Sequence, residues 1–171
     1  MLNIVLYEPE IPENTGNISR NCVGFNAKLH MIKPYGFILN EKTVKRAGLD
    51  YWKYLDLKEY NSWNDFENLN NINDKSKIFF SSKRGNINSF NLNLKMENKD
   101  EEIYIVFGKE STGITKEILL KYKNKVFFIP MNENVRSFNL SNCVAILSYE
   151  FHRQNEFKYL GIENIKYVKQ I

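Results

Sequence analysis

Histidine and cysteine are scarce in this sequence, and their scarcity excludes several kinds of active site. The 171 residues contain two of each. His30 lies within an apolar run and His152 near the end of a helical pattern, so neither a histidine-based metal centre nor a Ser-His-Asp triad can be built. Cys22 and Cys143 are far apart in the sequence, which excludes a closely spaced metal or redox pair and favours structural thiols. Chemistry without a metal or a triad remains.

Long hydrophobic runs and phosphate-binding motifs are also missing. No apolar run approaches the ~20 residues needed to cross a bilayer. Neither GxxxxGK[ST] nor GxGxxG occurs, so a nucleoside triphosphate or dinucleotide of the usual kind is not indicated. Residues 1–7 have no basic region before them and are followed at once by Glu8 and Pro9, which indicates a first buried strand and not a signal peptide. We therefore expect a cytoplasmic protein without a membrane segment.

The composition fits one globular domain over residues 1–171, because 43% of the residues are hydrophobic and can fill a core. The net charge of +4 permits nucleic-acid binding without requiring it. Nine of the 24 basic residues form three groups, and each group fits either a solvated face or a nucleic-acid contact. The groups are Lys42, Lys45, Arg46 and Lys53; Lys83 and Arg84; and Lys158, Lys166 and Lys169.

Short apolar runs alternate with segments of helical spacing. This alternation predicts an α/β fold with a mostly parallel sheet flanked by helices on both faces. The asparagine-rich segment 85–100 fits either a long loop or an excursion at the sheet edge. The expected strands are residues 4–7, 29–32, 78–80, 103–107 and 126–129, and the expected helices are residues 16–25, 41–47, 62–69, 115–122 and 140–153.

The loop after the first strand, residues 8–20, carries the first candidate site residues. Its two prolines stiffen the backbone, and Gly16 allows a close turn into a helix. Arg20 is expected about one turn into that helix, where it could point back over the strand ends toward an anion or a developing oxyanion. The alternative is a surface arginine.

Two further loops each follow a strand and precede a helix. In residues 107–113, Gly108 and Gly113 flank Glu110 and allow the backbone to approach a flat ligand, although a glycine pair alone is a weak signal. Residues 132–142 form a polar stretch between an apolar strand and an apolar helix, which predicts a binding loop. The alternative is a helix start with redundant caps at Ser137, Asn139 and Ser141.

Taken together, these motifs resemble the SPOUT superfamily of RNA methyltransferases. The likeness runs over essentially the whole chain and is greatest to the short single-domain tRNA ribose 2′-O-methyltransferases that act on cytidine or uridine at the wobble position. The residues that carry it are Leu6 to Pro12 with Asn14 to Asn17 and Arg20, Arg46 to Tyr51, Phe107 and Gly108 with Glu110 and Gly113, Ile129 to Met131, Arg136 and Ser137, and Asn139 to Asn142.

The resemblance implies a fold in which the C-terminal part is threaded through a loop as a trefoil knot, an exception to the rule against knots. It implies S-adenosylmethionine as cofactor, held near Phe80, Gly108, Ile129 and Ser137. It also implies a homodimer with the last helix in its interface, tRNA as the partner and no metal. On that helix Tyr149 and Arg153 would contact RNA or the partner subunit, or Tyr149 would pack in the core.

The same resemblance implies catalytic roles. Arg20 would stabilise the developing alkoxide or hold a phosphate. The polar residues that would position Arg20 and the ribose are Asn14, Glu110, Ser137 and Asn139. The expected activity is therefore S-adenosylmethionine-dependent 2′-O-methylation of the wobble nucleotide. The alternatives are methylation of another RNA, such as rRNA, and a non-catalytic knotted RNA-binding module. The presence of Arg20, Glu110 and Asn139 argues against the non-catalytic module.

The chain departs from the family pattern at three places, which concern substrate contact more than methyl chemistry. Lys109 stands where relatives often have proline, and Thr112 where a basic residue is common. The segment 81–85 has an additional residue before its glycine. The resemblance therefore does not imply a rigid loop at Lys109 or an RNA contact at Thr112.

Overall fold

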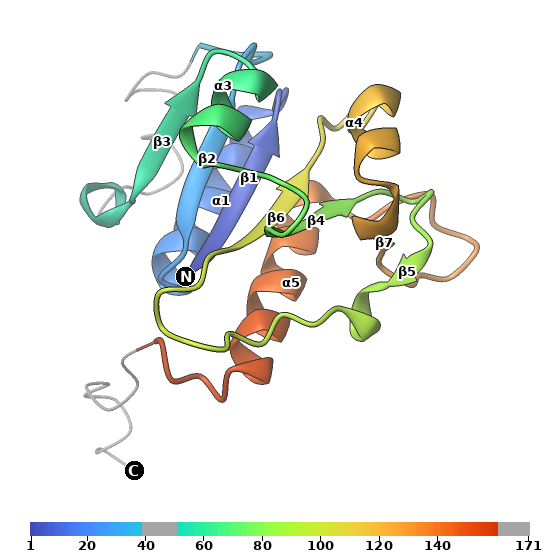
Figure 1. Ribbon diagram of the computed structural model, residues 1–171. Helices are drawn as coiled ribbons and strands as arrows, with labels where there is room; N and C mark the ends of the chain where they lie inside the picture. Colours follow the sequence, from blue (N-terminus) through green and yellow to red (C-terminus); the bar gives the residue numbers. More distant parts are fainter. Residues whose placement is uncertain (39–50, 161–171) are drawn as a thin grey trace.

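The computed structural model describes residues 1–38 and 51–160, which form a parallel sheet flanked by helices (Figure 1). The sheet has seven strands in the order β3-β2-β1-β6-β4-β7-β5, and every pair of neighbours is parallel. This arrangement confirms the predicted α/β class. The strands are β1 (Leu2–Tyr7), β2 (Lys28–Ile32), β3 (Leu57–Tyr60), β4 (Lys77–Ser81), β5 (Ile87–Asn88), β6 (Ile103–Phe107) and β7 (Val126–Phe128).

Helices cover both faces of the sheet. Helices α1 and α5 pack together on one face, and α3 and α4 lie on the other (Figure 1). The bounds are α1 (Pro12–Gly24), α3 (Trp63–Leu69), α4 (Lys116–Lys121) and α5 (Leu140–Gln154), with 3₁₀ turns at Trp52–Tyr54, Ser89–Asn91 and Lys123–Lys125.

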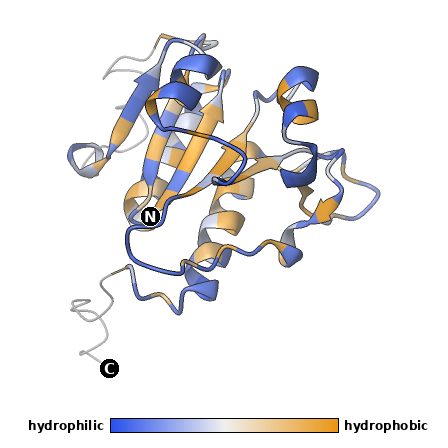
Figure 2. Ribbon diagram, in the orientation of Figure 1, coloured by the Kyte–Doolittle hydropathy of each residue, from blue (hydrophilic) through white to orange (hydrophobic). Residues whose placement is uncertain are grey.

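The side chains of each strand alternate between two apolar cores, as the pleat of a sheet requires. In β1, Ile4 and Leu6 pack under α1 and α5, whereas Val5 and Tyr7 face α3 and α4. The central strands are accordingly apolar on both sides, and Figure 2 shows hydrophobic residues concentrated there. This is why continuous apolar runs marked these strands in the sequence.

All five predicted strands are present, but the start of the first helix was predicted wrongly. Helix α1 begins at Pro12, four residues before Gly16, because proline suits the first helical position, where its missing N–H is not needed. Arg20 consequently lies about two turns into the helix and not one. The predicted helix at 41–47 lies outside the described residues. Helices α3, α4 and α5 confirm the other three predictions within one residue at each end.

Two strands were missed. Strand β3 lies at one edge of the sheet, and its Lys58 and Glu59 are exposed, so it lacks an apolar run. Strand β5 forms the other edge with only two residues. It lies within the asparagine-rich segment 85–100, which is therefore an excursion at the sheet edge.

The segment after β5 runs along the C-terminal end of α5. Leu94 and Met96 are buried, and their backbone N–H groups donate to the side chains of Gln154 and Asn155, each at 2.8 Å. The same two amides donate in return to the carbonyls of Leu92 and Leu94, each at 2.9 Å. These four hydrogen bonds fix the end of α5 against residues 92–96.

Candidate functional site

The loops that follow β1 and β6 meet at the carboxyl ends of these neighbouring strands. The carboxylate of Glu110 accepts hydrogen bonds from the backbone N–H groups of Glu10 at 2.9 Å and Ile11 at 3.3 Å. The carboxylate of Glu10 in turn accepts from the N–H and the hydroxyl of Ser111, both at 2.8 Å, and these bonds lower the pKa of Glu10. The two loops are therefore joined by reciprocal carboxylate contacts.

An ion pair adds a third connection. Lys109 Nζ lies 2.5 Å from Glu8 Oε2, and the hydrogen bond to Glu8 raises the pKa of Lys109. Both side chains are largely covered, with 26% and 19% of their surface exposed. Lys109 is thus itself held, and the loop around it is tied to the loop after β1.

Three of the predicted catalytic residues form one hydrogen-bonded chain. Asn14, in the first turn of α1, donates from Nδ2 to Glu110 Oε1 at 3.0 Å. Asn139 Nδ2 donates to Asn14 Oδ1 at 2.9 Å. Asn139 Oδ1 also accepts from the N–H of Ser141 at 2.8 Å and so caps the start of α5. These hydrogen bonds therefore link the loop after β6 with α1 and the start of α5.

The backbone around Gly108 is too close to its surroundings for any side chain. A Cβ at this position would lie 2.3 Å from the carbonyl carbon of Gly113 and 2.4 Å from the nitrogen of Ile114. The loop closes through a hydrogen bond of 2.9 Å from Gly113 N to Lys109 O, and Gly113 has a φ of +75°. Both glycines are required by this turn.

Arg20 lies on a different face of α1. It is exposed together with Glu13 and Asn17, whereas Asn14 is buried. Its guanidinium stacks over the ring of Tyr51 at 5.1 Å from the ring centroid. Positions six residues apart are roughly 120° apart around a helix, so Arg20 and Asn14 point in different directions. The structure thus groups three of the four predicted catalytic residues.

The four predicted cofactor residues lie in three different kinds of place. Gly108 directly follows β6 and Ile129 directly follows β7, so both lie at the carboxyl ends of the strands. Phe80 is fully buried, and its ring stacks on Tyr122 at 4.6 Å in the core under α3 and α4. The backbone of Phe80 lies inside the sheet, in register with Val106 of β6 and Val126 of β7. Ser137 is exposed on the loop that precedes α5.

The polar stretch 132–142 is more open than its place between two apolar elements suggested. Residues 132–139 are all exposed, and only Ser141 is buried. Of the three candidate caps, Asn139 is the residue that caps α5, and Ser137 lies two residues before it. Asn139 therefore both caps α5 and contacts Asn14 in the candidate site.

The described ranges 1–38 and 51–160 contain no group of three or more His, Cys, Asp or Glu residues that could hold a metal ion. Among the same residues, no helix is long and apolar enough to span a membrane. Cys22 is buried and Cys143 partly buried; both are free, and burial raises the pKa of each thiol.

The SpoU rRNA Methylase family model matches residues 1–149. The chain belongs to the SpoU methylase family.

Curated relatives of this SpoU-family chain cover almost its full length. Proteins named tRNA (cytidine(34)-2′-O)-methyltransferase are 42% identical over 160 residues in Geobacillus stearothermophilus and 42% identical over 159 residues in Bacillus subtilis. The match covers 94% and 93% of this chain and 99% and 96% of the relatives. A protein of the same name from Mycoplasma genitalium is 43% identical, with 94% of this chain and 95% of the relative covered.

Solved structures agree with the family assignment. An RNA methyltransferase from Bacillus anthracis superposes with a TM-score of 0.86 at 37% identity, covering 95% of this chain and 99% of its own. A structure from work on the 2-OH methylation of C/U34 on tRNA gives 0.81 at 37% identity, covering 92% and 98%. The methyltransferase AviRb from Streptomyces viridochromogenes, solved with AdoMet, gives 0.75 at 19% identity over 91% and 58%, a likeness of fold alone.

Several residues that make contacts in the candidate site were not among the site residues predicted from the sequence. Glu8, Glu10 and Ser111 connect the two loops, and Tyr51 lies under Arg20. Two signals were available for the first three of these residues: Glu8 and Glu10 lie within the motif of residues 6–12, and two short loops with charges of both signs each follow an apolar strand. Their contact depends on β1 and β6 being neighbours, which the sequence does not state.

Proposed function

We propose that this chain is an S-adenosylmethionine-dependent tRNA 2′-O-methyltransferase that acts on nucleotide 34, a cytidine or uridine. The relatives named for this reaction support the proposal, because they match at about 42% identity from end to end. The structural observation that most supports the proposal is the series of hydrogen bonds from Glu110 through Asn14 to Asn139. It joins three segments of the sequence at the carboxyl edge of a parallel sheet, where α/β proteins bind ligands.

The residues present fit an adenosyl group. Gly108 and Ile129 offer backbone amides and carbonyls just beyond two strand ends, and the side chain of Ile129, 9% exposed, supplies an apolar wall. Phe80, one residue before the end of β4, and the hydroxyl of Ser137 complete the proposed set. When bound, the cofactor supplies an electrophilic methyl group on its sulfonium. Isothermal titration of S-adenosylmethionine against Ile129→Asp tests this assignment, and unchanged affinity would contradict it.

The remaining groups position the ribose and handle its proton. In the proposed site, Asn14 and Asn139 hold the sugar hydroxyl in line for displacement, and Glu110 orients Asn14 through its hydrogen bond of 3.0 Å. Arg20 stabilises the developing alkoxide or holds a phosphate. Since Arg20 lies on the exposed face of α1, we assign it to a site completed by a second subunit. Arg20→Ala should abolish transfer and leave cofactor affinity measurable; an active variant would refute the assignment.

We also propose that the chain is a homodimer with α5 in the interface. Ile146 and Tyr149 lie three residues apart on the outer face of this helix and are 42% and 54% exposed. An apolar pair on an exposed helix face is typical of a subunit contact. Light scattering tests the proposal: the wild type should have the mass of a dimer, and Ile146→Glu should lower it. A monomeric wild type would exclude the interface.

The C-terminal trefoil knot is part of the same proposal. Strands β4 and β6 are hydrogen-bonded neighbours connected by residues 82–102, and part of this connection lies over the end of α5. We infer that the chain after β7 passes through the loop so formed. A crystal structure whose chain trace leaves residues 129–139 outside that loop would contradict the knot. A tRNA substrate further favours the cytoplasmic location expected from the sequence, which cell fractionation tests.

The decisive experiment is incubation with labelled S-adenosylmethionine and unmodified tRNA. Label should appear in nucleotide 34, and the bond after it should resist alkaline cleavage because the 2′-hydroxyl is blocked. A sister activity on rRNA is the second candidate, favoured by the description of the matched family. Transfer to rRNA but not to tRNA would establish that alternative, and transfer to no RNA would indicate a non-catalytic binding module.

A further inference from the structure

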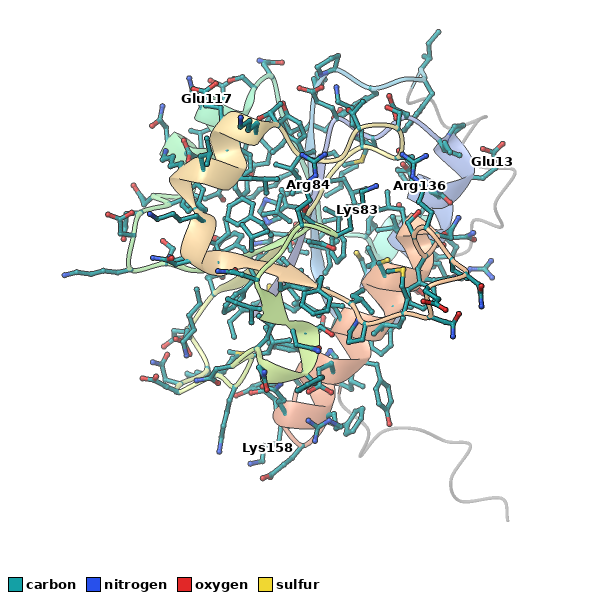
Figure 3. All side chains as sticks on the ribbon, turned by 90° about the vertical axis from the view of Figure 1, so that its right-hand side faces the viewer. Glu13, Lys83, Arg84, Glu117, Arg136 and Lys158 are labelled. Carbon is teal, nitrogen blue, oxygen red and sulfur yellow. The ribbon has the colours of Figure 1, made fainter. Side chains whose placement is uncertain are left out.

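Three exposed cations lie on the loops that follow β4 and β7. Lys83 and Arg84 are on the first loop and Arg136 is on the second, and Figure 3 shows all three on one face of the molecule. Figure 1 places both loops at the same side of the sheet, beyond β7. None of the three takes part in an ion pair with another described residue. We call these three residues the basic surface.

The backbone that presents the first two cations is held in place. A tight turn is closed by a hydrogen bond of 2.9 Å from Gly85 N to Ser82 O, and Ser82 N donates to Phe127 O, also at 2.9 Å. A Cβ at Gly85 would lie 2.3 Å from the carbonyl carbon of Phe127, so the turn is pressed directly onto β7. Lys83 and Arg84 therefore project from a fixed support.

Arg136 follows a second closed turn. Val135 N donates to Asn132 O at 3.1 Å, and Asn134 N donates to Asn132 Oδ1 at 3.0 Å. Three residues after Arg136 comes Asn139, which belongs to the hydrogen-bonded chain of the site. The basic surface thus adjoins the place where the ribose is proposed to bind.

The local charge is predominantly positive. Residues 82–96 contain three basic residues and no carboxylate, and Glu133 is the one carboxylate of residues 129–139. Glu133 makes no ion pair with any described residue. In Figure 3 Glu13 and Glu117 lie on either side of the three cations. An anionic ligand is therefore attracted to the part of this face between Glu13 and Glu117, where the basic surface lies.

We propose that the basic surface binds backbone phosphates of the RNA next to the nucleotide that is methylated. The inference rests on the proposed function, since a ribose whose 2′-hydroxyl enters the site carries a phosphate on each side. Arginine guanidinium groups match phosphate oxygens with two parallel hydrogen bonds, and two of the three cations are arginines. Neither Arg84 nor Arg136 has to leave an ion pair with a described carboxylate to do so. The contacts set affinity and register without reading the base.

The test compares the triple variant Lys83→Gln, Arg84→Gln, Arg136→Gln with Lys99→Gln. Lys99 is also exposed, but it precedes β6 and so lies at the opposite end of the sheet. Binding of unmodified tRNA is measured over a series of salt concentrations. We expect the slope of log affinity against log salt to fall by about one for each cation removed, and the dissociation constant to rise at least about tenfold at low salt. Lys99→Gln should leave both unchanged.

Cofactor binding, oligomeric state and activity separate the outcomes. The triple variant should bind S-adenosylmethionine normally, keep the mass of the wild type and raise KM for tRNA more than it lowers kcat. Lost cofactor affinity would mean that the surface holds the cofactor carboxylate, and a changed mass would mean a subunit contact; either overturns the inference. The three single variants, each with a slope lower by about one, replace the triple variant if it misfolds.

Failure of this inference is distinguishable from failure of the proposed function. If the wild type methylates nucleotide 34 and the variants bind tRNA with unchanged affinity and slope, the basic surface is not the phosphate site and the proposed function stands. If the wild type neither binds nor methylates tRNA, both are wrong.

Discussion

Asn139 Nδ2 donates a hydrogen bond to Asn14 Oδ1 at 2.9 Å, although 125 residues separate the two in the sequence. The other end of the same amide caps α5 by accepting from the N–H of Ser141. One side chain therefore fixes the start of α5 and connects it to the first turn of α1. Because the NH₂ group of Asn139 contacts Asn14 and its carbonyl oxygen caps α5, a mutation can remove one of these two contacts and keep the other.

Replacement of Asn139 should separate capping from activity. Asn139→Asp keeps the oxygen that caps α5 but loses the donor to Asn14, so methyl transfer should fall at least tenfold with little loss of stability. Asn139→Ala should lose both, at an additional cost of about 1 kcal/mol for the missing cap. Ser62→Ala, which removes the cap of α3, is the matched control and should lower stability alone. Urea unfolding and initial rates measure the two effects, and an active Asn139→Asp enzyme would count against the assigned role.

Glu110→Gln should disrupt the junction of the two loops. All three groups that contact this carboxylate are donors, from Glu10, Ile11 and Asn14. An amide in either orientation turns an NH₂ group toward at least one of them, which should cost about 1–3 kcal/mol in stability. The rate should fall at least tenfold. Glu117→Gln, an exposed carboxylate in the first turn of α4, should behave like the wild type.

Gly108→Ala should displace the loop after β6. The added methyl group would lie 2.3 Å from the backbone of Gly113, so the turn that carries Glu110 has to move. We expect at least a tenfold loss of both cofactor affinity and methyl transfer. Gly24→Ala is the control, because a Cβ there meets nothing within 4 Å. Normal kinetics of Gly108→Ala would show that the close approach has no functional importance.

His30 should make the stability of the fold depend on pH. It is 1% exposed, with Nε2 at 2.9 Å from Asn3 Oδ1 and Nδ1 at 2.7 Å from the hydroxyl of Tyr60. A neutral ring satisfies both, donating to Asn3 and accepting from Tyr60. Burial, together with the charges of Lys28 and Lys58, lowers the pKa of His30 from 6.5 to about 3.

In the unfolded chain His30 therefore becomes protonated below pH 6.5, whereas in the folded chain it becomes protonated only near pH 3. The free energy of unfolding should decrease as the pH falls through this window, by an amount on the order of a few kcal/mol. His30→Gln keeps one donor and one acceptor and does not titrate, so its profile should be flatter. Urea unfolding of both proteins from neutral to acidic pH measures the difference, and parallel profiles would contradict the role of His30.

The sequence pattern predicted most of the sheet because the central strands are buried on both sides. It missed β3, whose Lys58 and Glu59 face solvent at the sheet edge. It also placed the start of α1 too late, because Pro12 was interpreted as a loop residue although proline favours the first position of a helix. That error put Arg20 one turn too close to the strand ends.

The site was only partly predictable for a different reason. The resemblance pointed to Asn14, Glu110 and Asn139 as residues of one site, and the structure brings these three together. The reciprocal contacts of Glu10 with Ser111 and of Glu110 with the backbone of Glu10 depend on which strands are neighbours. Strand order is a property of the whole chain and leaves no local signature in either loop.

Helix α5 is fastened by amide side chains at both ends, by Asn139 at its start and by Gln154 and Asn155 at its finish. A slip of one residue along the axis, about 1.5 Å, would break both sets of contacts at once. The helix consequently connects the site to residues 92–96, and contacts at both of its ends fix its position along its axis. A substitution at Gln154 that loosens the far end should therefore be felt at Asn139, more than three helical turns away.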